Sequence, residues 1–318
     1  ISLVGNEKNV EIAFRLANKA ILLQRKWAKP DEPALVWYPF QLGFILLALS
    51  SLADENHIDR NIADLLWFPT GGGKTEAYLG LIAFVLFFRR LRYGDRGAGV
   101  ASFMRYTLRL LTVQQFQRAA ALICACEILR NGEEVPSDIH VNFSKIPFSL
   151  GLWVGSETTP NTFDKALEAL EDENAQNRPD QLKYCPRHRS SRLQWIAHGK
   201  KREIHAHCPE EGCLWNRNSQ NIPVWTVDED IYRKCPTLVI GTIDKFAQVA
   251  RKSETVSMFG MKSGYIQPDL IIQDELHLVS GPLGTLAGLY EVAIDRLCTR
   301  DGIRPKIIAS TATIRQAA

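Results

Sequence analysis

A glycine-rich turn between two apolar segments is the first feature of this sequence that could do chemistry. The stretch LLWFPTGGGKTEAYLG, residues 65–80, places three glycines at 71–73, followed at once by Lys74 and Thr75. A strand that feeds such a turn and opens into a helix exposes backbone N–H groups at the positive end of the helix, where an anion can bind. The glycines let the backbone close around phosphates, the lysine can reach the β and γ phosphates, and the threonine hydroxyl can hold Mg²⁺. The sequence therefore predicts a site for a nucleoside triphosphate.

Two acidic residues follow a later apolar run. The stretch LIIQDELHLVSG, residues 270–281, puts Asp274 and Glu275 at the end of a predicted buried strand. There Asp274 can hold Mg²⁺ directly or through water, and Glu275 can polarise an attacking water. Taken alone, two carboxylates at a strand end are more often solvated or cap a helix. The phosphate loop in the same chain favours the catalytic interpretation.

An alternation of short apolar runs with longer helical segments must position these loops. The pattern predicts buried strands at 64–68, 99–106, 148–154, 237–241, 270–273 and 306–309. It predicts helices at 9–27, 40–52, 74–91, 112–131, 162–173 and 283–298. Strands that alternate with helices indicate an α/β fold, with a parallel sheet covered by helices on both faces.

The composition is that of a globular protein. The chain has 318 residues, 46% of them hydrophobic, and a formal net charge of +3, which permits contact with phosphates without requiring it. The longest apolar stretches, 40–53 and 77–88, fall short of the roughly 18 residues that a membrane span needs, so we expect buried helices and no membrane partner. No export leader opens the chain, so the cytoplasm is the expected location. Because the first residue is Ile1, we expect the chain to be a piece of a longer protein.

The polar region 171–225 breaks the alternation and carries a possible metal site. YCPRH and HCPEEGC offer a C-x₂-H pair and a C-x₄-C pair, whose candidate Zn²⁺ ligands are Cys185, His188, Cys208 and Cys213. Metal binding would supply the folding free energy that this polar segment lacks, and His205 or His207 could replace one ligand. Without a metal, these residues would be reduced surface thiols and solvated histidines. The other cysteines, at 124, 126, 235 and 298, lie in apolar contexts and are expected to be core thiols.

The glycine-rich loop resembles motif I of superfamily 2 helicases. These enzymes often lack the first glycine of G-x-x-x-x-G-K-T and read x-P-T-G-x-G-K-T, which residues 69–75 match, with Phe68 in place of the glycine. The resemblance implies ATP as the nucleotide, with Lys74, Asp274 and Glu275 as catalytic residues and Mg²⁺ held by Thr75 and Asp274. The implied nucleotide ligands are Gln41, Thr70, Gly71, Gly72, Gly73, Lys74 and Thr75, where Gln41 lies in YPFQ at the place of an adenine-reading glutamine.

Other segments resemble further motifs of this superfamily, in the expected order. His277 completes D-E-x-H, IIASTAT resembles motif III, TLRLLTVQQ resembles motif Ia, and VIGTIDKF resembles motif Ib. The resemblance implies that Arg109, Gln114, Gly241 and Thr242 meet nucleic acid and that His277, Thr311 and Thr313 couple nucleotide state to it. Motifs Ia and Ib and the glutamine segment are each also compatible with ordinary strand-end or helix-start chemistry. The resemblance to helicase motifs therefore rests on their order and spacing in the chain.

Longer phrases narrow the resemblance. MRYTLRLLTVQQFQRA, DEDIYRKCPTLVIGTIDKFA and DELHLVSGPLGTLAGLYEVAID are similar to DrmA-type helicase subunits of the DISARM anti-phage defence system. The resemblance implies a bacterial ATPase that acts on single-stranded or forked DNA with a DrmB-type partner. It also implies a first RecA-like lobe at 64–170 and 226–318, preceded by a helical segment at 1–63 and interrupted by a zinc-ribbon-like insert at 171–225. A second lobe would supply the arginine finger, so we expect the isolated lobe to hydrolyse ATP poorly.

The expected function is therefore that of an ATP-dependent DNA helicase or translocase. Two alternatives remain open from the residues alone. A P-loop ATPase that does not act on nucleic acid could use the same loop, and a zinc-stabilised interaction module could carry a vestigial nucleotide site. The basic run 200–202 is compatible with phosphate contact or with a solvated charged face.

Overall fold

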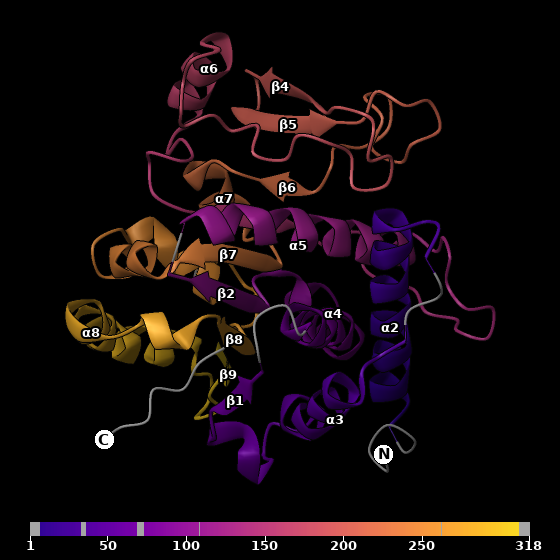
Figure 1. The fold of residues 1–318 in the computed structure, drawn as a ribbon, viewed down its shortest axis with the longest axis vertical. Coiled ribbons are helices and arrows are strands. Elements are labelled where there is room, and N and C mark those ends of the chain that lie inside the picture. The colour runs from indigo at the N-terminus through magenta and orange to yellow at the C-terminus, as the bar shows by residue number, and fades with distance from the viewer. Residues whose placement is uncertain (1–6, 33–35, 69–72, 108, 262, 312–318) are drawn as a thin grey trace.

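A computed structural model describes residues 7–32, 36–68, 73–107, 109–261 and 263–311 (Figure 1). Its α-helices are α2 (Lys8–Ala28), α3 (Pro39–Ala53), α4 (Lys74–Tyr93), α5 (Arg109–Arg130), α6 (Phe163–Glu171), α7 (Asp228–Lys234) and α8 (Gly281–Cys298). Its strands are β1 (Asp64–Trp67), β2 (Ser102–Tyr106), β3 (Leu150–Trp153), β4 (Gln194–His198), β5 (Glu203–His207), β6 (Val224–Trp225), β7 (Leu238–Thr242), β8 (Leu270–Gln273) and β9 (Lys306–Thr311).

Seven strands form one parallel sheet in the order β1-β9-β8-β2-β7-β3-β6. All six strands predicted from the sequence are present in it, so the predicted α/β fold with a parallel sheet is confirmed. The short strand β6 at one edge was not predicted, because two residues are too few to show a period. β6 lies within 171–225, so this segment also contributes to the main sheet.

Alternate residues of the central strands enter two different cores. Met104, Ile240 and Ile272 belong to a large core that also contains the buried faces of α2, α3, α4 and α5. Phe103, Val239 and Ile271, each one position earlier, belong to a second core with α8. Successive side chains of a strand point to opposite faces, so helices cover both faces of this sheet, as expected.

The helix α4 is the centre of the larger core. It packs against α2, α3 and α5, and its residues from Ala77 to Phe88 are all buried. The apolar run that the sequence shows at 77–88 is therefore a buried helix, as predicted. Among the described residues, none of the helices combines the length and the apolar character that crossing a membrane requires.

The region around the histidines is ordered, although its polar sequence shows no sustained period. β4 and β5 pair as an antiparallel hairpin, and α6 packs on one face of it through Phe163, Ala166 and Ile204. In Figure 1 the hairpin and α6 lie together beyond α5, away from β1 and β8. We did not predict this hairpin, because the side chains of β4 do not alternate and the polar–apolar alternation of β5 extends over only five residues.

Candidate functional site

The order of the strands brings the carboxyl ends of β1, β9 and β8, which are far apart in the sequence, to one edge of the sheet. β9 lies between β1 and β8 and pairs with both, with Trp67 opposite Thr311 and Gln273 opposite Ala309. The carboxyl ends of parallel strands point the same way, so Phe68, which follows β1, lies at the same end of the sheet as the acidic residues after β8. This edge is the candidate nucleotide site.

The start of α4 supplies the first side chains of the site. Gly73 caps the helix in the left-handed region with φ of 84°, which glycine adopts without steric cost. Lys74 is largely buried, and its ammonium donates to the Phe68 carbonyl at 2.6 Å. Thr70, Gly71 and Gly72 lie outside the described residues.

Asp274 is the centre of a buried hydrogen-bond network. Its Oδ2 accepts from the Tyr78 hydroxyl at 2.7 Å, and its Oδ1 accepts from the backbone N–H of Glu275 at 2.9 Å and from the Ser310 hydroxyl. The Tyr78 hydroxyl is also hydrogen-bonded to Thr75 Oγ1 at 3.0 Å. One hydroxyl thus joins the two residues expected to hold Mg²⁺, which lie almost two hundred positions apart in the chain.

Tyr78 was not singled out from the sequence. Burial, reinforced by the negative charge of Asp274, raises the pKa of the Tyr78 hydroxyl well above its ordinary value, so it remains a proton donor at neutral pH. The signal was available, since residues three and four apart lie on one face of a helix and Tyr78 follows Thr75 and Lys74 at these spacings. Ser310 belongs to the IIASTAT segment, in which the sequence analysis singled out only Thr311 and Thr313.

Glu275 and His277 form the outer part of the network. Glu275 has φ of 50°, a strained backbone position for a residue with a side chain, directly after the strand end. Its Oε2 lies 3.3 Å from His277 Nδ1, and the same nitrogen lies 3.0 Å from Thr311 Oγ1. The structure therefore connects the acidic motif to the end of β9, while Thr313 lies outside the described residues.

Gln41 lies beside the glycine turn, but its polar atoms are occupied. Its Oε1 accepts from the Tyr38 backbone N–H at 2.9 Å and its Nε2 donates to the Gly73 carbonyl at 2.7 Å, with the side chain 3% exposed. The Phe40 ring stacks on Phe68 with centroids 3.8 Å apart. The phenylalanine that replaces the first loop glycine therefore packs α3 onto the loop, and adenine recognition by Gln41 stays a prediction.

The residues expected to meet nucleic acid have different environments. Gln114 is exposed on α5, whose first residue is Arg109, so contact by these two stays a prediction. Thr242 is 0% exposed, and a Cβ at Gly241 would lie 2.8 Å from the Trp153 carbonyl oxygen. Thr242 is therefore buried in this conformation, and glycine is needed at position 241 because the Trp153 backbone leaves no room for a side chain.

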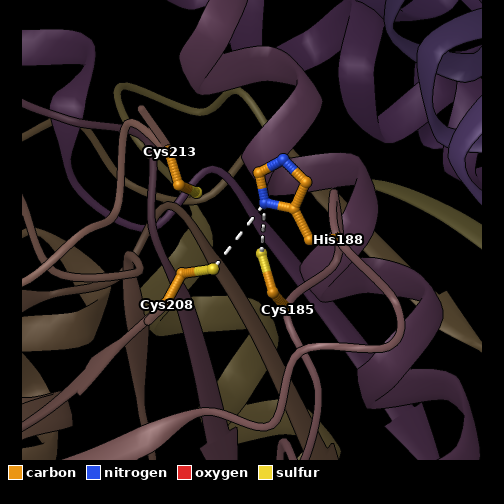
Figure 2. A group of neighbouring side chains, drawn as sticks. All are labelled: Cys185, His188, Cys208 and Cys213. Carbon is orange, nitrogen blue, oxygen red and sulfur yellow. Dashed lines mark hydrogen bonds between the residues drawn. The ribbon is translucent and has the colours of Figure 1, made fainter. Parts of the chain in front are cut away.

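The four expected zinc ligands converge from two loops (Figure 2). One ligand atom from each of Cys185, His188, Cys208 and Cys213 lies within 4.8 Å of the others. His188 Nδ1 is 3.9 Å from Cys185 Sγ and 3.7 Å from Cys208 Sγ. A hydrogen bond with Cys185 lowers the pKa of Cys213 to about 5, so one thiolate is available at neutral pH.

The remaining cysteines, Cys124, Cys126, Cys235 and Cys298, are all buried, as predicted. Burial raises the pKa of each thiol, because it disfavours the charged thiolate. They are thiols of the core and lie outside both candidate sites.

The sequence of this chain is similar to that of a known defence protein. No protein-family model matches the chain. Over its whole length the chain is 38% identical to the DISARM protein DrmA of Bacillus paralicheniformis, and it spans about a third, 34%, of that protein.

Two solved structures are similar in fold. Mss116p bound to single-stranded RNA and AMP-PNP has a TM-score of 0.51 and 12% sequence identity, and the match covers 95% of this chain and 38% of that one. The DUF1998 helicase MrfA has a TM-score of 0.48 and 14% identity, covering 94% of this chain and 29% of that one. At such identity the likeness to Mss116p shows the fold alone. The chain is thus similar to DrmA over the whole of its own length, and it has a RecA-like fold.

Proposed function

We propose that this chain is the first motor lobe of an ATP-dependent DNA helicase or translocase that works in bacterial anti-phage defence of the DISARM type. The observation that carries the proposal is the shared contact at Tyr78. Its hydroxyl is hydrogen-bonded both to Thr75, next to the phosphate-loop lysine, and to Asp274, at the end of the acidic strand. A phosphate-loop threonine hydroxyl and a strand-end aspartate are the pair that holds Mg²⁺ in P-loop nucleotide hydrolases.

Each residue of the edge has a proposed role. Lys74 would exchange its bond to the Phe68 carbonyl for the phosphates of ATP, and Thr75 and Asp274 would hold Mg²⁺, which would supply positive charge against the phosphates. Glu275 orients and polarises the attacking water. Glu275 and Thr311 both contact His277, so a change at the water-activating carboxylate reaches the end of β9.

The Cys/His cluster is proposed to be a structural zinc site. Three sulfurs and one imidazole nitrogen suit tetrahedral Zn²⁺, and four protein ligands leave no position for a reacting water. Zinc would join the 185–188 loop to the 208–213 loop. Because ligand thiols must be deprotonated, the lowered pKa of Cys213 supports metal binding at neutral pH.

DNA, a DrmB-type partner and a second RecA-like lobe are the proposed partners. The similarity to DrmA supports the defence context, and about two thirds of the relative lie outside the matched part, which leaves room for a second lobe. The MrfA helicase has been solved bound to DNA, and DNA is our proposal for this chain.

The test is ATP hydrolysis by the intact protein with single-stranded, forked and duplex DNA. Lys74→Ala is expected to abolish turnover while DNA binding remains, and Lys165→Ala, at an exposed lysine of α6, is the matched control. Undiminished hydrolysis by Lys74→Ala would remove the phosphate-loop assignment. Turnover that no DNA stimulates would favour a P-loop ATPase of another kind. Absence of nucleotide binding, together with one tightly held zinc, would favour an interaction module.

A further inference from the structure

Three histidines share one face of the β4–β5 hairpin. Glu203, His205 and His207 occupy alternate positions of β5, and His198 of β4 pairs with Glu203. Directly opposed and alternate residues of an antiparallel pair point to the same side. The other side of the hairpin, with Ile204, is the side that packs on α6. The histidines therefore face away from α6.

The three imidazoles are close enough to share one ion. The ring centroids of His198 and His205 are 4.3 Å apart, and His207 lies 6.1 Å from His205 and 6.3 Å from His198. One ring nitrogen from each lies within 4.8 Å of the others. Two nitrogens bound to tetrahedral zinc at about 2.0–2.1 Å lie about 3.4 Å apart, so side-chain rotations that move each ring by about 1 Å would close the set.

Two of these histidines carry buried ring nitrogens without hydrogen-bond partners among the described residues. His205 and His207 are only 9% and 6% exposed. Neither His207 Nδ1 nor His198 Nε2 has a hydrogen-bond partner among the residues that the structure describes, although both atoms are buried. Leaving a buried polar atom unpaired costs about 1–3 kcal/mol. A ligand that accepts these lone pairs would remove that cost.

Glu203 fixes the third ring. His205 Nε2 lies 2.7 Å from Glu203 Oε2, and the other carboxylate oxygen is 2.7 Å from the Lys234 ammonium. An anchored carboxylate accepts the Nε2 proton and leaves the opposite ring nitrogen, Nδ1, free to bind. Carboxylates beside metal-binding histidines commonly act in this way.

This cluster is separate from the Cys/His cluster. His207 and Cys208 are neighbours in the chain, but neighbours in an extended segment point to opposite sides, and the two residues fall into two different ligand groups. The sequence had left open that His205 or His207 replaces a zinc ligand of the cysteine site. The structure instead places each of them with His198.

We propose that His198, His205 and His207 form a second metal site, which takes a divalent first-row transition ion, with Zn²⁺ as the expected occupant. Imidazole suits zinc, and three protein nitrogens leave a fourth position for water or an external ligand. Glu203 acts as the positioning residue of His205. The chain would then hold two metal ions of different ligand chemistry a few residues apart.

The experiment measures zinc per chain by mass spectrometry after the full chain has been loaded with Zn²⁺ and dialysed. An organomercurial reagent is then added, which binds thiolates and releases only the zinc held by cysteines. The wild-type protein is expected to hold two equivalents, one of which resists the mercurial. His207→Gln and His205→Gln should each lose the resistant equivalent, and Cys208→Ser should lose only the sensitive one. His140→Gln, at an exposed histidine outside both clusters, is the matched control.

Two outcomes would overturn the proposal. In the first, the wild-type protein holds no zinc that resists the mercurial. In the second, the histidine variants still hold the resistant zinc. X-ray absorption at the zinc edge of mercurial-treated wild-type protein needs no variant and so does not depend on whether the variants fold. It should show a shell of nitrogen or oxygen at about 2.0–2.1 Å with no sulfur. Sulfur in that shell would assign all bound zinc to the cysteines.

Discussion

Replacing Tyr78 with phenylalanine tests the network on which the candidate nucleotide site rests. The substitution removes a fully buried hydroxyl that donates to Asp274 and is hydrogen-bonded to Thr75, and it leaves the packed ring in place. A hydrogen bond to a charged group contributes about 1.5–3 kcal/mol. Asp274 keeps its bonds from Ser310 and from the Glu275 backbone, so the loss should fall at the lower end, about 1.5–2 kcal/mol.

Urea unfolding followed by circular dichroism measures this loss. We expect a lower transition midpoint with an unchanged slope, and a fall in Tm of about 2–3 °C for a chain of 318 residues. Tyr184→Phe is the control, because Tyr184 is exposed and surface substitutions usually change stability by less than about 0.5 kcal/mol. If Tyr78→Phe were as stable as Tyr184→Phe, the tyrosine would not bridge the phosphate loop and the acidic strand.

Three further predictions concern other buried groups. Burial raises the pKa of Asp230 from an ordinary value of 3.8 to about 6. Between these two pH values the folded chain binds one more proton at Asp230 than the unfolded chain does. The stability of the wild-type protein therefore rises as the pH falls through that window. The free energy of unfolding of Asp230→Asn should therefore exceed that of the wild type by up to about 3 kcal/mol at pH 7, and the difference should vanish near pH 4. Urea unfolding at a series of pH values measures this difference. A difference that does not change with pH would contradict the assignment. Lys245→Ala should lower the stability by about 3–5 kcal/mol, because it leaves Asp228 buried without the ammonium that lies 2.8 Å from its carboxylate. The double variant Lys245→Met/Asp228→Leu, which leaves no buried charge, should lose far less. Equal losses of stability in thermal unfolding would refute this reasoning. Gly73→Ala should lower the Tm, because it forces φ of 84° on alanine and places its Cβ 2.6 Å from Gln41 Nε2, and Gly43→Ala, which meets open space, is the control.

The sequence predicted most of the main sheet and its helices. The six buried strands and six helices were visible because apolar residues recur at the strand and helix periods over enough positions. It did not predict β6, α7 or the β4–β5 hairpin. These elements are short or polar, and their conformation depends on contacts with the sheet and α6 rather than on a local pattern.

The candidate sites divide in the same way. Residue types and spacing alone singled out Lys74, Thr75 and Asp274, because a glycine turn or a carboxylate at a strand end can be recognised from a few consecutive residues. The four Cys/His ligands were also named from spacing, and the structure brings them together.

Only the tertiary structure decided which residues share a site. The order of β1, β9 and β8 places Asp274 and Ser310 against the start of α4, and hairpin register sets three histidines apart from the cysteines next to them in the chain. Sequence spacing reports which side chains share a face of one element. Contacts between elements depend on strand order and register, which are fixed by packing over the whole core.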